Sequence, residues 1–186
     1  MPPGGIGWQN NVRNVGHAIE TVKLAIASGP MYEYSPNPEA YHCPGDQRMK
    51  RLNLRQGWAF DSYSKAGGMN SVAWGGATPI QTYGEILNPS DKYVFVEEAD
   101  PRGANWGSWV LNPISHTWVD PLAVWHNWKS TLSFADGHAI THRWLEKTTL
   151  TASQLGSQSR FFWSKAKDDR DFLYLEPRYM WKGSKF

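Results

Sequence analysis

Apolar residues recur every three or four positions near the start of the chain, which is the spacing of one face of an α-helix. The residues concerned are Val12, Val15, Ile19, Val22 and Ile26. Asn10 or Asn11 can cap the first turn, and Gly29-Pro30 is typical of a helix end. The pattern therefore predicts one amphipathic helix over residues 11–27.

Short apolar and aromatic runs, separated by Gly, Pro, Asn and Asp, follow farther along and are typical of β-strands. They cover residues 57–64, 92–97, 107–111, 130–135 and 138–144. Asp136-Gly137, between the last two runs, suits the two positive φ angles of a type I′ hairpin turn. We expect an α+β fold in which the opening helix packs on an antiparallel sheet, with long loops rich in Trp and Pro.

A length of 186 residues allows one core but hardly two. We assign residues 1–144 to the main α+β unit. Residues 145–186 alternate aromatic and charged blocks, and we expect this C-terminal extension to fold back on the main unit.

The charge is nearly balanced, with 19 basic and 17 acidic residues and a net charge of +2, so the chain lacks the basic excess of a nucleic-acid-binding protein. The single cysteine, Cys43, cannot form an internal disulfide, and we expect it to be buried and inert rather than a nucleophile. The opening Met-Pro-Pro-Gly-Gly does not resemble a signal peptide and suggests a cut through a longer sequence.

Tryptophan is unusually frequent, with 11 residues. Exposed indole rings can stack on sugars or anchor subunit contacts, whereas buried ones fill a core, and we favour the core for most of them. The candidates for ligand stacking are Trp106, Trp109, Trp118, Trp125 and Trp128.

Carboxylates gather in the second half of the chain. They could supply the oxygen ligands of calcium, from Glu98, Asp100 and Asp136, or the paired acids of a glycoside hydrolase, from Glu97, Glu98 and Asp136. Asp120 is a further member of the group. The simplest interpretation is that Glu97 and Glu98 end a strand and face solvent or an arginine.

Three histidines near Asp136, namely His126, His138 and His142, raise the possibility of zinc. His138 and His142 share a face of one strand but lie about 13 Å apart at strand spacing, which disfavours a common ion. We instead expect Asp136 and Gly137 to hold the turn and His126 to hydrogen-bond into it.

Four blocks of residues occur in an order that resembles a known family. Nine residues separate His126 from Asp136-Gly137, as in an H-X9-DG signature. The other blocks are Cys43-Pro44 with Asp46 (CP-x-D), Ser62-Tyr63-Ser64 followed by Met69-Asn70 (SYSMN), and a strand over 93–98 with an acidic end. Together, over residues 26–144, they resemble the type II secretion pseudopilin-like proteins of Planctomycetes, Verrucomicrobia and Lentisphaerae.

The resemblance implies a pilin-like head, a structural subunit of a type II secretion or type IV pilus-like assembly in the cell envelope, without catalysis. Its partners would be other pseudopilin or envelope subunits. Contact with the membrane would require an N-terminal prepilin helix, which the given sequence lacks. Two alternatives stay open: a carbohydrate-active protein that binds or hydrolyses polysaccharide, and a calcium-stabilised, adhesin-like surface domain.

Overall fold

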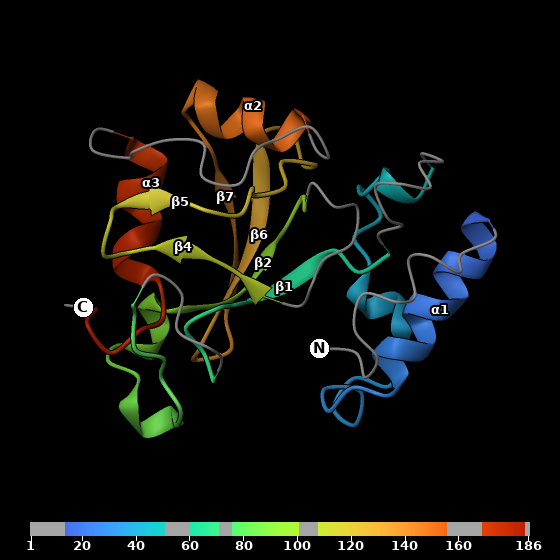
Figure 1. The fold of residues 1–186 in the computed structure, drawn as a ribbon, viewed down its shortest axis with the longest axis horizontal. Helices are drawn as coiled ribbons and strands as arrows, with labels where there is room; N and C mark the ends of the chain where they lie inside the picture. Colours follow the sequence, from blue (N-terminus) through green and yellow to red (C-terminus); the bar gives the residue numbers. More distant parts are fainter. Residues whose placement is uncertain (1–13, 51–59, 71–75, 101–107, 156–168, 185–186) are drawn as a thin grey trace.

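The computed structural model describes residues 14–50, 60–70, 76–100, 108–155 and 169–184 (Figure 1). Its centre is a five-stranded sheet in the order β3-β1-β2-β6-β7. The strands are β1 (Tyr63–Ala66), β2 (Tyr93–Glu97), β3 (Ser108–Trp109), β6 (Lys129–Phe134) and β7 (Ala139–Arg143). A short ribbon of β4 (Leu111–Asn112) and β5 (Thr117–Trp118) lies apart from this sheet.

The expected α+β class is confirmed, but a purely antiparallel sheet is not. β1 pairs with β2, β2 with β6 and β6 with β7 in antiparallel fashion, whereas β1 and β3 run parallel. The run predicted over 107–111 is divided between β3 and β4 by Val110. The first predicted strand ends farther on, at Ala66, and its first three residues lie outside the described ranges.

The opening helix, α1, spans Val15–Ala27. Its cap is Asn14, whose side chain accepts a hydrogen bond from the backbone N–H of His17, while the predicted caps Asn10 and Asn11 lie outside the described residues. The end at Ala27 is as predicted. α1 packs mainly on the 3-10 helices η2 (Pro38–Tyr41) and η3 (Arg48–Lys50), beside β1, and not across the sheet as expected (Figure 1).

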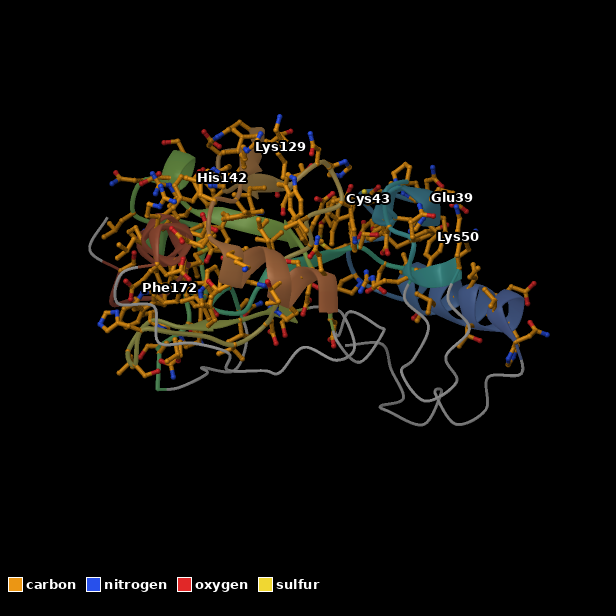
Figure 2. All side chains as sticks on the ribbon, turned by 90° about the horizontal axis from the view of Figure 1, so that it is seen from above. Glu39, Cys43, Lys50, Lys129, His142 and Phe172 are labelled. Carbon is orange, nitrogen blue, oxygen red and sulfur yellow. The ribbon has the colours of Figure 1, made fainter. Side chains whose placement is uncertain are left out.

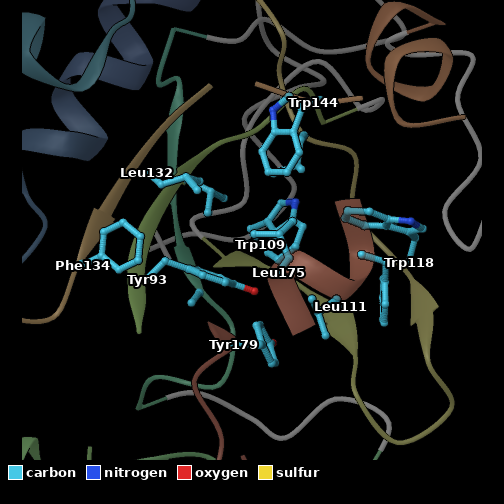
Figure 3. Close-up of a cluster of buried hydrophobic side chains, with 13 residues drawn as sticks. Tyr93, Trp109, Leu111, Trp118, Leu132, Phe134, Trp144, Leu175 and Tyr179 are labelled. Carbon is cyan, nitrogen blue, oxygen red and sulfur yellow. The ribbon is translucent and has the colours of Figure 1, made fainter. Parts of the chain in front are cut away.

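Aromatic side chains fill the core between the sheet and the C-terminal helix α3 (Arg170–Leu175) (Figure 3). Trp118 packs edge-on against Trp109 and Phe172, with ring centroids 6.2 and 5.2 Å away. Phe172 and Leu175 of α3 belong to the same buried cluster as the strand residues. Helix α3 therefore completes the core of the sheet.

The N-terminal end of α3 is held by hydrogen bonds to neighbouring segments. Asp169 caps the helix and also accepts a 2.8 Å hydrogen bond from the indole of Trp118. Asp171, which is buried, accepts from the backbone N–H groups of Leu145 and Glu146, just before α2 (Lys147–Leu155). Among the helices in the described ranges, none combines the length and the apolar character needed to cross a bilayer.

The β6–β7 hairpin turns at Asp136-Gly137, as predicted, but the turn is not of type I′. The N–H of Phe134 donates to the carbonyl of His138, and the N–H of Gly137 donates to the carbonyl of Phe134. Of the two predicted left-handed residues only Gly137 has a positive φ, at +96°. This is the pattern of a three-residue loop that ends on a left-handed glycine.

Replacing Gly137 with alanine should lower the free energy of unfolding by about 1–2 kcal/mol, because an L-residue resists this φ. A Cβ added there meets nothing within 4 Å, so the loss comes from the backbone alone. Gly137→Asn should cost less, since asparagine tolerates the left-handed region. Urea unfolding would measure all three proteins, and equal midpoints for Gly137→Ala and the wild type would contradict the prediction.

Candidate functional site

Residues from four separate blocks of the sequence meet where η2 approaches the ends of β1 and β2. The loop after η2 brings Cys43 and Asp46, the residue before β1 is Ser62, β2 ends at Glu97, and His126 precedes β6. Figure 2 shows Cys43 between the sheet and the part of the chain that holds η2 and α1. We call these five residues the motif cluster.

Asp46 and Ser62 form the first half of the motif cluster. The Asp46 carboxylate is buried, with 1 % exposed, and receives Arg48 in a bidentate pair, with Nη2 2.7 Å and Nε 3.0 Å from its oxygens. The hydroxyl of Ser62 donates to the same carboxylate at 2.9 Å and accepts from the N–H of Cys43 at 2.9 Å. These bonds fasten the loop after η2 to the start of β1.

Arg48 extends this half beyond the five cluster residues. Its Nη2 also donates to the carbonyl of Asp61, and its guanidinium lies 4.9 Å from the ring centroid of Trp125. Nothing in the sequence analysis singled out Arg48. Its position two residues after Asp46 was the one available signal.

Cys43, Glu97 and His126 form the second half. Nε2 of His126 lies 3.2 Å from Sγ of Cys43 and 2.9 Å from Oε1 of Glu97. The other oxygen of Glu97 accepts a 3.0 Å hydrogen bond from the N–H of Thr131 in β6. Cys43 and Glu97 are buried, while 39 % of the His126 side chain is exposed.

This half is not a nucleophilic triad. Such a triad places the nucleophile and the carboxylate on different ring nitrogens of the histidine, whereas here both contact Nε2. Burial, followed by the charge of Glu97, raises the pKa of Cys43 to about 11, so its thiol is protonated at neutral pH. The arrangement suits hydrogen bonding or metal ligation, because one donor atom from each residue lies within 4.8 Å of the others.

Three further buried carboxylates form a group of their own. Glu98, Asp100 and Asp120 are all buried, and Asp120 accepts from the N–H of Val110 at 2.8 Å. Burial raises the pKa of Glu98 well above its usual range, and the neighbouring Asp120 and Asp100 raise it further. Neither Glu97 nor Glu98 faces solvent as expected, because both are fully buried, and a sugar chain cannot reach either residue in this structure.

The structure does not bring Asp136 to these carboxylates. Asp136 lies in the exposed turn, five residues beyond Thr131, which bonds to Glu97, and this is about 16 Å of strand. Neither the predicted calcium set nor the predicted hydrolase set is therefore assembled. The expected bond from His126 into the turn is wrong for the same reason.

The other two histidines, His138 and His142, contact different neighbours. His138 contacts Asp136 at 2.6 Å and stacks on Phe134, with ring centroids 4.3 Å apart. His142 stacks on Tyr174 of α3 at 3.8 Å. The three histidines that were weighed as zinc ligands, and disfavoured on spacing, therefore have separate neighbours.

The remaining motif residues have structural surroundings. Tyr63 stands opposite Glu97 in the β1–β2 ladder, and Ser64, which is buried, stands opposite Val96. Pro44 is exposed in the turn after Cys43.

The tryptophan candidates divide into two groups. Trp109 and Trp118 are fully buried in the core and cannot stack on a ligand, and Trp106 lies outside the described residues. Trp125 and Trp128 line a hollow of about 590 Å³ together with Arg48. Trp128 is 36 % exposed, so this pair retains the capacity to contact a ligand.

Comparison with protein families, curated proteins and solved structures gives no match for this chain. A function for this chain is therefore inferred from the geometry of the motif cluster and of the hollow.

Asp61, directly before Ser62, should make the free energy of unfolding fall as the pH rises, which is opposite to the usual effect of a carboxyl group. Burial of its carboxyl group raises its pKa to about 7, against the opposing effect of Arg48. The folded state then holds a proton that the unfolded state releases between pH 4 and 7, so this group lowers the free energy of unfolding as the pH rises through that window. The expected loss is on the order of 2–4 kcal/mol.

Asp61→Asn should remove this contribution. Relative to the wild type, the variant should gain stability from pH 4 to pH 8 in denaturant unfolding at constant salt. Wild-type and variant curves that stay parallel over this range would contradict the prediction.

Proposed function

We propose that this chain is the head of a pseudopilin-like structural subunit in a type II secretion or pilus-like assembly of the cell envelope. One observation supports this proposal above the others. Five of the residues that carry the family resemblance, those of the motif cluster, join each other in one largely buried network, in which Asp46, Ser62 and Glu97 are completely or almost completely covered. Residues arranged in this way hold a fold together, whereas a catalytic centre must admit its substrate.

The hairpin gives a physical reason for the nine-residue spacing of the H-X9-DG signature. His126 stands at the open end of the β6–β7 hairpin, in the motif cluster, and Asp136-Gly137 form the closed end. The residues between them are the length of β6 that joins the two ends. A fixed spacing therefore follows from an arm anchored at both ends, without any chemistry shared between His126 and Asp136.

Cross-linking in the cells that produce the protein tests the proposal. Envelope fractions are treated with an amine-reactive cross-linker, precipitated with antibodies against the chain and analysed by mass spectrometry. We expect recovery with the membranes and adducts with proteins that carry a prepilin-type segment. Recovery from the soluble fraction, with no adduct above the background set by an unrelated envelope protein, would overturn it.

The hollow beside Trp125 and Trp128 favours polysaccharide binding as a second candidate function. Exposed indole rings offer flat apolar faces to sugars, and the guanidinium of Arg48, which also lines the hollow, lies 4.9 Å from the ring centroid of Trp125. Trp128→Ala should abolish retention on insoluble polysaccharide. Tyr83→Ala, which removes an exposed aromatic ring outside the hollow, is the matched control and should bind as the wild type does.

A further inference from the structure

We propose that Cys43, Glu97 and His126 form a binding site for a zinc ion. The three side chains provide a sulfur, an oxygen and a nitrogen ligand, and the ligand atoms lie within 4.8 Å of one another. This inference does not rest on the proposed envelope function.

The donor set selects the class of metal. Zinc binds thiolate sulfur, imidazole nitrogen and carboxylate oxygen, usually with four ligands in a tetrahedron. Calcium and magnesium prefer oxygen ligands alone, so a site with one cysteine and one histidine disfavours both. A sequence search based on histidine spacing could not find this set, because Cys43 and His126 are 83 residues apart.

The distances fit a common ion. Zinc bonds of about 2.0–2.3 Å place the ligand atoms of a tetrahedron about 3.3–3.8 Å from one another. Here Nε2 of His126 lies 3.2 Å from Sγ of Cys43 and 2.9 Å from Oε1 of Glu97. Movements of less than about 1 Å would therefore open the space for the metal, with both neighbours already facing the nitrogen that would ligate it.

Surrounding hydrogen bonds hold two of the ligands in place. The N–H of Thr131 donates to Oε2 of Glu97 at 3.0 Å, which leaves Oε1 directed at His126. The N–H of Gly45 donates to Sγ of Cys43 at 3.3 Å, a contact that also stabilises a thiolate. Such outer partners orient metal ligands, and their loss typically weakens metal binding by about 10–100-fold.

His126 supplies the access route. Cys43 and Glu97 are covered, but the partly exposed imidazole forms the outer wall of the group, so an ion can arrive from solvent. Three protein ligands leave a fourth position for water on that side. The bound ion would join the loop after η2, the end of β2 and the start of the β6–β7 hairpin, and would stabilise the folded chain.

Cobalt spectroscopy on the tag-free, chelator-treated protein tests the site. We expect one equivalent of Co²⁺ to give a thiolate-to-cobalt charge-transfer band and the intense visible bands of a tetrahedral site, and one equivalent of Zn²⁺ to remove both. Zinc should also raise the melting temperature. Absence of the charge-transfer band in the wild type would overturn the proposal without reference to any variant.

Substitutions then locate the site. His126→Gln and Cys43→Ser should each weaken zinc binding by more than about 100-fold in calorimetry, because changes to outer partners alone cost 10–100-fold. His138→Gln is the control, since His138 is a similarly exposed histidine beside a carboxylate, and it should leave the affinity unchanged.

Two results would contradict this assignment: zinc affinity that survives in His126→Gln, or affinity that falls equally in His138→Gln. His126→Gln alters an exposed residue, so it should fold even if Cys43→Ser does not. The envelope cross-linking described above does not depend on zinc, so failure of either proposal can be recognised separately.

Discussion

Asp46→Ala is expected to lower the free energy of unfolding by about 3–5 kcal/mol. The substitution leaves Arg48, of whose side chain 15 % is exposed, without its bidentate partner, and it also leaves the buried hydroxyl of Ser62 without its acceptor. Removing one member of a buried ion pair is costly because the remaining charge stays desolvated. Urea unfolding followed by tryptophan fluorescence would measure the loss.

An exposed ion pair provides the matched control. Arg170 pairs with Glu146 at 2.6 Å, but 66 % of the arginine side chain is exposed, so the urea midpoint of Arg170→Ala should stay close to that of the wild type. Asp46→Asn keeps the size of the side chain and loses its charge. Its free energy of unfolding should fall between those of Asp46→Ala and Arg170→Ala. If Asp46→Ala unfolds at the same urea concentration as Arg170→Ala, the motif cluster does not hold the loop after η2 in place.

Local chemistry made the β6–β7 hairpin predictable. An Asp-Gly pair between two apolar runs is typical of a hairpin turn, so the predicted position of the hairpin was correct. The turn type was wrong because the same dipeptide fits two loops. In a type I′ turn Asp136 and Gly137 would both be central, whereas the observed pairing of Ser133 with Ala139 moves the centre to Ala135 and Asp136.

Long-range pairing was not predictable from the sequence. The parallel contact of β1 with β3 joins Lys65 to Ser108, and periodicity reports which face of a strand is apolar without naming its neighbour. The packing of α1 is a similar case. The apolar stripe predicted the helix, but the stripe alone does not distinguish η2 and η3 from a sheet as its partner.

In the candidate site, too, single residues could be predicted from the sequence but their contacts could not. His126 and the acidic end of β2 both stood out in the sequence, yet their contact crosses 29 residues and follows from the β2–β6 register. The signature names His126 and Asp136 together, and the sequence therefore predicted a contact between those two residues instead. In this chain the nine-residue spacing of the signature spans the whole of β6. His126 at one end contacts Glu97, whereas Asp136 at the other end lies in the hairpin turn.

Gly68→Ala is expected to destabilise the protein severely, by about 3 kcal/mol or more, which exceeds most overpacking substitutions. A Cβ on Gly68 would stand 1.5 Å from the carbonyl oxygen of Met180 and 2.7 Å from its carbonyl carbon. Both atoms belong to the backbone, so no change of rotamer can relieve the overlap. The segment around Met180 has to move away from the turn after β1.

That displacement should be visible in hydrogen exchange. Met180 and Tyr179 are buried, and Lys182 donates a 2.9 Å backbone hydrogen bond to Thr78, so movement of this segment exposes core residues and breaks a connection to residues 76–80. We expect the peptide covering 179–184 to lose protection in Gly68→Ala. Gly84→Ala, where the added Cβ meets nothing within 4 Å, should exchange as the wild type does. Unchanged protection of 179–184 in a folded Gly68→Ala protein would mean that the C-terminal segment does not dock on the turn after β1, and the completion of the core by that segment would then have to be abandoned.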